Sequence, residues 1–155
     1  MSQFDPSTFL DATIDAPMTK RKTLPEGDYL AQIGDIEARA WQGKKDPTKS
    51  GMAYDVPLTL QIPMELQEEL GYSELKLSDS IMLDLTPQGT IDIGPGRNGR
   101  LRMYREALDL NKPGTKFSAR MMSGQLVKVS VKHELYDAAD GTQGISERVR
   151  AVGRA

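Results

Sequence analysis

The sequence predicts a mainly β fold, and three observations favour it. Apolar and polar side chains alternate along several short stretches, which is the period-2 pattern of half-buried strands. Glycine, proline and asparagine residues separate these stretches at short intervals, as turns do. Helical spacing is confined to short segments between them. The chain of 155 residues is long enough for one domain with its own hydrophobic core.

The N-terminal part of the chain differs from the rest. We expect residues 1–23 to form an arm or linker and residues 24–155 to form the β domain. Asp5, which a proline follows, is a typical helix start, because aspartate caps free amides and proline fits the first helical position. A short turn of helix through Phe9 and Leu10 is therefore predicted.

The first predicted strand is long and bent. Apolar residues alternate over residues 29–33 and again over residues 36–40, but on the opposite parity. The phase slips at Gly34 and Asp35. An extra residue at a glycine indicates a β-bulge, which bends a strand and increases its twist. A strand of this kind can pair in two parts of a curved sheet, as a small barrel requires.

The middle of the chain predicts shorter elements. Residues 54–62 form the second predicted strand, in which Pro57 lacks an amide and indicates a sheet edge or a bulge. A short helix is expected over residues 63–71, opened by proline and closed by glycine. A third strand, or a pair of short strands, follows over residues 75–85. A short return strand is predicted over residues 90–93.

The C-terminal part predicts helices followed by a hairpin. Helical spacing covers residues 100–110, and a second short helix is expected over residues 115–122. Strong alternation predicts strands over residues 126–136 and 147–153. The order of elements suits a small Greek-key β-barrel of the OB type with short inserted helices. A β-sandwich is the alternative fold.

Composition narrows the chemistry. The chain has no cysteine, which excludes disulfides and thiolate metal ligands. No apolar run approaches the roughly 18 residues of a membrane span, and the N-terminus has no leader pattern, so we expect a cytoplasmic protein without membrane contact. The single histidine, His133, lies on the apolar parity of a strand and is expected at the core boundary. No catalytic motif is found, and neither an enzyme nor a cofactor is predicted.

Charge is unevenly distributed along the chain. Residues 97–155 contain 12 Lys and Arg residues against 6 Asp and Glu residues, whereas residues 1–96 contain 8 against 16. An asymmetry of this size can mark a surface that binds a polyanion. Uneven surface charge without a function is the alternative.

The only tryptophan precedes a lysine-rich loop between the first two strands. A single-stranded nucleic acid has a charged backbone and exposed base faces, so its binder needs cations and flat aromatic side chains. In OB folds the loop at this place contacts the ligand. The alternative is a solvated hairpin whose tryptophan folds back on the core. The candidate residues of this group are Arg39, Trp41, Lys44, Lys45, Lys49 and Tyr54.

Two further groups of cations are candidates. The polar parity of the last two strands predicts a basic patch that ends in a tyrosine, although solvated strand faces also carry lysines. The glycine-rich loop at residues 94–99 precedes a helix, whose N-terminus favours anions, and predicts contacts to backbone phosphates. The residues of these two groups are Lys128, Lys132, Tyr136, Arg148 and Arg150, and Arg97 and Arg100.

Three stretches of the chain resemble a group of small bacteriophage proteins, the phage-encoded single-stranded-DNA-binding proteins and their relatives. The stretches are "LPEGDYLAQIGDIEAR…SGMAYDVPLTLQI", "GRLRMYREALDLNKPG" and "SGQLVKVSVKHELYDAADGTQGISERVRAV". The resemblance covers residues 24–152. It implies an OB-fold protein that coats single strands without sequence preference during phage DNA replication and recombination. The basic last residues differ from the acidic C-terminal tail of many such proteins, so recruitment of partners through such a tail is not expected.

The expected partners follow from these observations. They are single-stranded DNA or RNA, phage replication proteins, and a second copy of the chain bound through the N-terminal arm. The alternative function is a phage protein–protein interaction or structural module without nucleic-acid contact, which would use Phe4, Phe9 and Leu10 of the arm.

Overall fold

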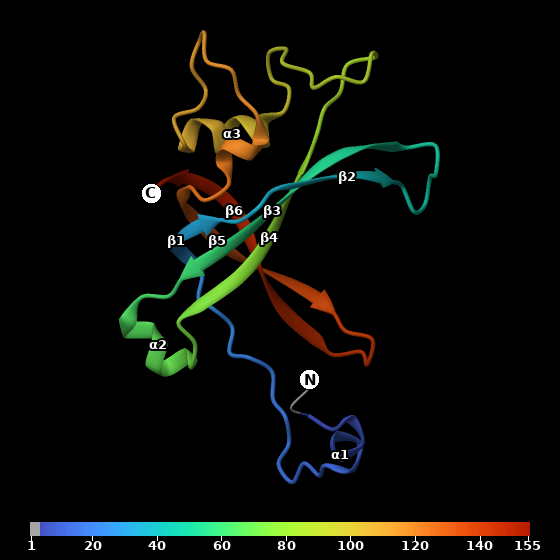
Figure 1. Ribbon diagram of the computed structural model, residues 1–155, viewed down its shortest axis with the longest axis vertical. Helices are drawn as coiled ribbons and strands as arrows, with labels where there is room; N and C mark the ends of the chain where they lie inside the picture. Colours follow the sequence, from blue (N-terminus) through green and yellow to red (C-terminus); the bar gives the residue numbers. More distant parts are fainter. Residues whose placement is uncertain (1–3) are drawn as a thin grey trace.

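The computed structural model describes residues 4–155 and is mainly β, as the sequence predicts (Figure 1). The strands in this part of the chain are β1 (Gly27–Ile33), β2 (Glu37–Gln42), β3 (Ser50–Gln61), β4 (Glu74–Met82), β5 (Leu126–Asp137) and β6 (Gln143–Arg154). The helices are α1 (Pro6–Asp11), α2 (Met64–Leu70), α3 (Gly99–Ala107) and the single 3₁₀ turn Ala119–Met122. None of these helices is long and apolar enough to cross a membrane.

The strands form one antiparallel sheet in the order β2-β3-β1-β5-β6, with β4 paired to β3. Strands β1 and β2 both pair with β3, β1 at residues 58–60 and β2 at residues 50–55. They are successive segments of one bent strand. Ala31 and Gln32 also pair with β5, so β1 connects the two halves of the sheet.

The bend between β1 and β2 is the bulge that the phase slip predicts. Residues 34–36 belong to neither strand, and Pro57 of β3 lies opposite this break. The missing amide of Pro57 therefore costs no ladder bond there, while its carbonyl accepts from Gly34 N at 2.8 Å. A Cβ at position 34 would approach Pro57 Cγ to 3.0 Å, which favours glycine. Pro57 therefore marks a bulge, which is one of the two predictions, and not a sheet edge, because β3 has paired strands on both sides.

The sheet does not close into the barrel that we expect from the sequence. Within residues 4–155 no hydrogen-bonded ladder joins β4 to β6. The side chain of Arg100 instead bridges the two strands, with Nη2 at 2.8 Å from Asp79 Oδ2 on β4 and at 3.0 Å from the Val149 carbonyl oxygen on β6. The Arg100 side chain thus lies between β4 and β6, where backbone pairing of the two strands would close a barrel.

One face of the sheet carries the buried side chains, and we call it the inner face; the opposite one is the outer face. The alternating residues of β1, β3 and β5 form the core on the inner face. Leu101 and Tyr104 of α3 cover the core on one side, and the Tyr104 hydroxyl donates to Asp79 Oδ2 at 2.6 Å. The central strand residues of the core are Tyr29, Ala31, Ile33, Val56, Leu58, Leu60, Val127, Val129 and Val131.

The segment between β4 and α3 differs from the prediction. Residues 90–93 form no strand, and only an isolated bridge joins Leu85 to Ile91. Asn98 holds this loop instead, because its side chain accepts from Asp84 N at 2.8 Å and donates to the carbonyls of Asp84 and Asp92. Similarly, the helix expected over residues 115–122 is reduced to the 3₁₀ turn.

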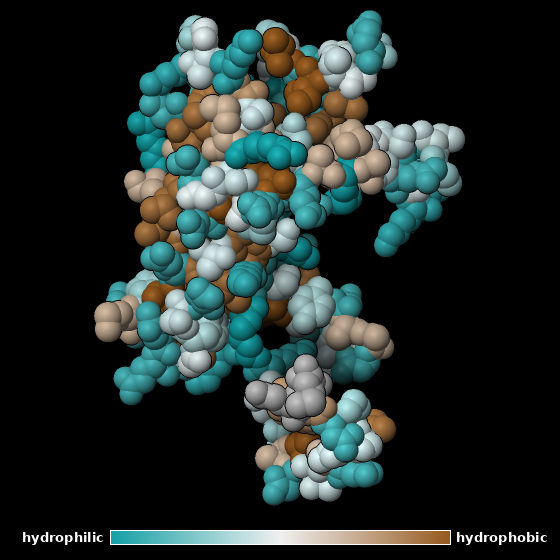
Figure 2. Space-filling model, viewed as in Figure 1, coloured by the Kyte–Doolittle hydropathy of each residue, from teal (hydrophilic) through white to brown (hydrophobic). Residues whose placement is uncertain are grey.

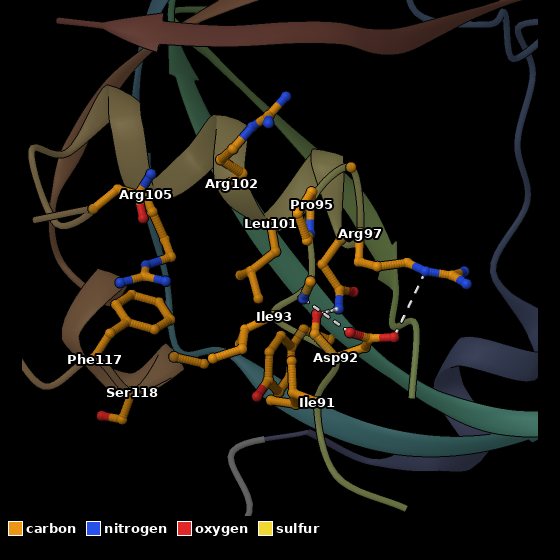
Figure 3. A pocket seen from close by; sticks show the side chains of 16 residues that line it. Ile91, Asp92, Ile93, Pro95, Arg97, Leu101, Arg102, Arg105, Phe117 and Ser118 are labelled. Carbon is orange, nitrogen blue, oxygen red and sulfur yellow. Dashed lines mark hydrogen bonds and ion pairs between the residues drawn. The ribbon is translucent and has the colours of Figure 1, made fainter. Parts of the chain in front are cut away.

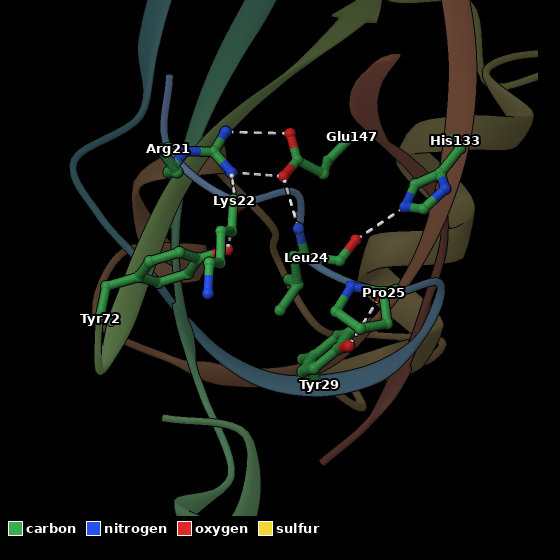
Figure 4. A network of polar contacts seen from close by, with 8 residues as sticks. All are labelled: Arg21, Lys22, Leu24, Pro25, Tyr29, Tyr72, His133 and Glu147. Atoms are coloured by element: carbon green, nitrogen blue, oxygen red, sulfur yellow. Dashed lines mark hydrogen bonds and ion pairs between the residues drawn. The ribbon is translucent and has the colours of Figure 1, made fainter. Parts of the chain in front are cut away.

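A buried carboxylate fixes the start of the β domain (Figure 4). The side chain of Glu147 on β6 is 4% exposed and pairs with both terminal nitrogens of Arg21. It also accepts from Leu24 N at 3.0 Å, and Leu24 is fully buried. His133, expected at the core boundary, is half-buried there, with Nε2 2.7 Å from the Leu24 carbonyl oxygen.

The Glu147 network predicts an acid transition. Hydrogen bonds from Arg21 lower the Glu147 pKa from 4.5 to about 2. The carboxylate therefore contributes its full stability above about pH 4.5 and loses it as the pH falls toward 2. We expect Glu147→Gln to lower the free energy of unfolding at pH 7 by about 2 kcal/mol, after a discount for the partly exposed Arg21.

Urea unfolding between pH 2 and pH 7 measures this effect. The difference between the wild type and Glu147→Gln should shrink as the pH falls through that range. Glu134→Gln is the matched control, because Glu134 is an exposed residue of the same hairpin and lies 3.8 Å from Arg148. Equal effects of the two substitutions would contradict the assignment.

Candidate nucleic-acid interface

The register of the sheet brings two of the predicted groups onto one face. Residues directly paired across antiparallel strands share a face. Trp41 pairs with Gly51, which lies on the same face of β3 as Thr59. Thr59 pairs with Gln32 of β1. Gln32 and Leu30 lie on the same face of β1, and Leu30 pairs with Lys128 of β5. The tryptophan and the β5 lysines therefore share the outer face.

Trp41 lies against a glycine. A Cβ at position 51 would be 2.9 Å from Trp41 Nε1 and 3.0 Å from two ring carbons, so the indole occupies the space that a side chain would fill. The ring is half-buried. Its Nε1 is the only buried side-chain nitrogen or oxygen without a hydrogen-bond partner in residues 4–155. The close contact with the Gly51 backbone thus holds the flat indole ring of Trp41 at the edge of the hairpin.

Tyr136 repeats this arrangement on the other hairpin. It pairs with Gly144 across β5 and β6, and a Cβ at position 144 would be 2.2 Å from Tyr136 Cζ. The tyrosine is 42% exposed. Two hairpins therefore each carry an aromatic ring over a cross-strand glycine on the outer face. The hairpins project from the same side of the molecule, and the surface between them is recessed (Figures 1 and 2).

The cations of the β2–β3 hairpin fall into two kinds. Arg39 lies on the outer face beside Trp41, and its Nε donates to Asp55 Oδ2 at 2.8 Å. This bond lowers the pKa of Asp55, and Ser80 also donates to that carboxylate. The loop lysines are exposed, and no ion pair within residues 4–155 engages them; they are Lys44, Lys45 and Lys49.

The cations of β5 and β6 are partly gathered. Lys132 and Arg148 are cross-strand partners on the outer face, and Arg148 is 3.8 Å from Glu134. Lys128 lies on the same face, four residues before Lys132. Arg150 is exposed, but it falls at the register shift between Ser130 and Val131 and has no directly opposite partner. Three of the four predicted cations therefore share one surface.

Three predicted residues lie away from this surface. Tyr54 is on the inner parity of β3 and lines a pocket beside α3. Arg97 is exposed in the loop before α3, 3.6 Å from Asp92. Arg100 is the bridge between β4 and β6 and is held by Asp79. The structure does not bring these three together with Trp41.

The pocket beside Tyr54 was not expected from the sequence. Its volume is about 480 Å³, and it lies between the loop before α3, α3 itself and the segment around Phe117 (Figure 3). The guanidinium carbon of Arg105 is 4.4 Å from the centroid of the Phe117 ring. The only signal for it in the sequence is the alternation of Ile91 and Ile93, and that pattern predicts a strand.

Comparison of the chain with protein-family models, with curated proteins and with solved structures finds no match to any of them.

The contact between Trp41 and Gly51 can be tested by adding one methyl group. Gly51→Ala must displace the ring, because the new Cβ would be 2.9 Å from Nε1. We expect the emission of this single tryptophan to shift to the red and the free energy of unfolding to fall by about 1 kcal/mol. Gly153→Ala is the control, since its Cβ meets only Lys128 Cε at 3.9 Å. Unchanged emission in Gly51→Ala would exclude the contact.

Proposed function

We propose that the protein binds single-stranded DNA without sequence preference, through aromatic stacking and phosphate contacts on the outer face of the sheet. The observation that carries the proposal is the pair of aromatic–glycine contacts beside exposed cations. Stacking on an aromatic ring is tolerant of sequence because every base has a flat face. Lysine and arginine side chains along the same face supply the counter-charge that a polynucleotide backbone requires.

The fold that suits this function is a partly open OB-type barrel, and the strand pairings support it. With β1 and β2 taken as one bent strand, the pairings follow a five-stranded Greek-key order, with α3 inserted between β4 and β5. Arg100 spans the remaining opening between β4 and β6. The loops at residues 43–49 and 138–142 then correspond to the two loops that contact oligonucleotides in OB folds.

The unpaired Trp41 Nε1 adds to the proposal. A buried donor without an acceptor costs roughly 1–3 kcal/mol. This cost offsets part of the packing energy of the ring on Gly51. A ring held in this way can move toward a ligand at less expense than a fully satisfied one, and its movement would allow Nε1 to find an acceptor. The resting place of Trp41 therefore suits a side chain that moves on binding.

A role in phage DNA replication and recombination is the biological setting we propose, because of the resemblance in residues 24–152. The alternative function, a protein–protein module, is favoured by the exposed apolar side chains of α1. A titration with nucleic acid separates the two, since the module would not respond to it.

Trp41→Ala tests the stacking. We expect tryptophan fluorescence of the wild type to be quenched by oligo-dT, and Trp41→Ala to lose about 1–3 kcal/mol of binding free energy in an anisotropy titration. The control is Tyr72→Phe, an aromatic residue whose hydroxyl donates to the Lys22 carbonyl away from the outer face. Absence of oligo-dT binding by the wild type at low salt would overturn the proposal.

The salt dependence of binding tests the phosphate contacts. Each phosphate contact that is removed should lower the slope of log K against log salt by about 0.7 for a single strand. We expect this reduction for Lys132→Ala and for Arg148→Ala. Lys112→Ala should leave the slope unchanged, because Lys112 pairs with Asp109 at 2.8 Å beside α3. Slopes that are equal in all three variants would place the phosphates elsewhere.

A further inference from the structure

Residues 4–19 of the N-terminal arm include several large apolar side chains, and none of these residues is buried. α1 is capped by Asp5, whose side chain accepts from Ser7 N at 3.0 Å, so the helix is formed although it buries none of its side chains. Phe9 is 63% exposed and Leu10 87% exposed. Ile14 is 75% exposed. Several large apolar side chains exposed on one short segment are typical of a segment that binds another protein surface.

The arm is attached firmly at its other end. The Arg21–Glu147 pair and the buried Leu24 hold the chain to the sheet. Lys22 adds a bond from Nζ to the Glu69 carbonyl at 2.9 Å. The arm is therefore fixed to the β domain at residues 21–24, and residues 4–19 extend from that point.

The pocket beside α3 has the complementary character, and we call it the Ile93 pocket. Ile93 is 90% exposed and Ile91 is 38% exposed, and both line the pocket (Figure 3). Its volume of about 480 Å³ lies within the range of roughly 300–1,000 Å³ typical of ligand sites. The lining holds three arginines and one acidic residue; they are Arg97, Arg102, Arg105 and Asp92.

Charge complements this apolar match. Residues 4–19 contain three aspartates and no lysine or arginine. Arg97 and Arg102 in the pocket have only long ion pairs, 3.6 Å to Asp92 and 3.7 Å to Glu106, and both side chains are more than half exposed. An acidic, phenylalanine-bearing segment thus meets the requirements of the pocket better than a basic or purely polar one.

The two surfaces lie at opposite ends of the molecule. α3 and the loop before it are at one end of the longest axis and α1 is at the other (Figure 1). We propose that the arm of one copy, residues 4–19, docks in the Ile93 pocket of the next copy. Different surfaces meet in this contact, so it is heterologous: successive copies add head to tail, in an open chain or a closed ring according to the rotation between them. The assembly needs no nucleic acid and is independent of the proposed function.

Sedimentation velocity of the full chain without nucleic acid tests the proposal. The average mass of the wild type should increase with concentration beyond that of a dimer. Phe9→Asp removes the arm contact and Ile93→Asp removes the pocket contact, and each should raise the dissociation constant at least about tenfold. Met64→Asp is the control, because Met64 is 83% exposed on α2 and outside both surfaces. Circular dichroism confirms that the variants are folded.

Mixing the two variants distinguishes this contact from any other. Phe9→Asp retains a working pocket and Ile93→Asp retains a working arm, so an equimolar mixture should form dimers and nothing larger. A wild type that stays monomeric, variants that still assemble alone, or a mixture that stays monomeric would each overturn the proposal. So would an Ile93→Asp variant that assembles normally but binds oligo-dT more weakly, which would assign the pocket to nucleic acid.

Discussion

The bend between β1 and β2 is the constraint on which the rest of the structure depends. Because Ala31 and Gln32 pair with both β3 and β5, β1 is the one strand that belongs to both halves of the sheet. The break at residues 34–36 lets the chain change direction while β3 keeps pairing on both sides of Pro57. The extra residue also changes which residues face outward, from the even-numbered ones in β1 to the odd-numbered ones in β2. Trp41 and Lys128 therefore lie on the same face of the sheet.

The ends of the two hairpins explain why the largest aromatic side chain lies outside the core. Leu135 and Ile145 are on the inner parity of β5 and β6, yet they are 65% and 46% exposed. The β5–β6 hairpin therefore extends past the core, and neither of its faces is covered by the core there. A ring at such a place packs on its own strand pair. Gly144 under Tyr136 and Gly51 under Trp41 provide that contact, since any Cβ would exclude the ring.

Local patterns predicted much of this fold. Alternation located β1, β3, β5 and β6, and the phase slip located the bulge, because side-chain period depends only on neighbouring residues. The Arg21–Glu147 pair could not be predicted, since its partners are 126 positions apart. The candidate site was predictable only in part. Tyr54 was grouped with Trp41 by proximity in sequence, but the register pairs Tyr54 with Ala38 and turns it to the inner face.

The charge asymmetry of the sequence separates into distinct surfaces in the folded chain. Some C-terminal cations are neutralised within residues 4–155, as Arg100 is by Asp79 and Lys112 by Asp109. Lys128 and Lys132 on the outer face have no ion pair in that part of the chain, whereas Arg97 and Arg102 of the pocket make only long ones. A polynucleotide on the outer face and an acidic arm in the pocket would therefore use different cations. Assembly and nucleic-acid binding then need not compete.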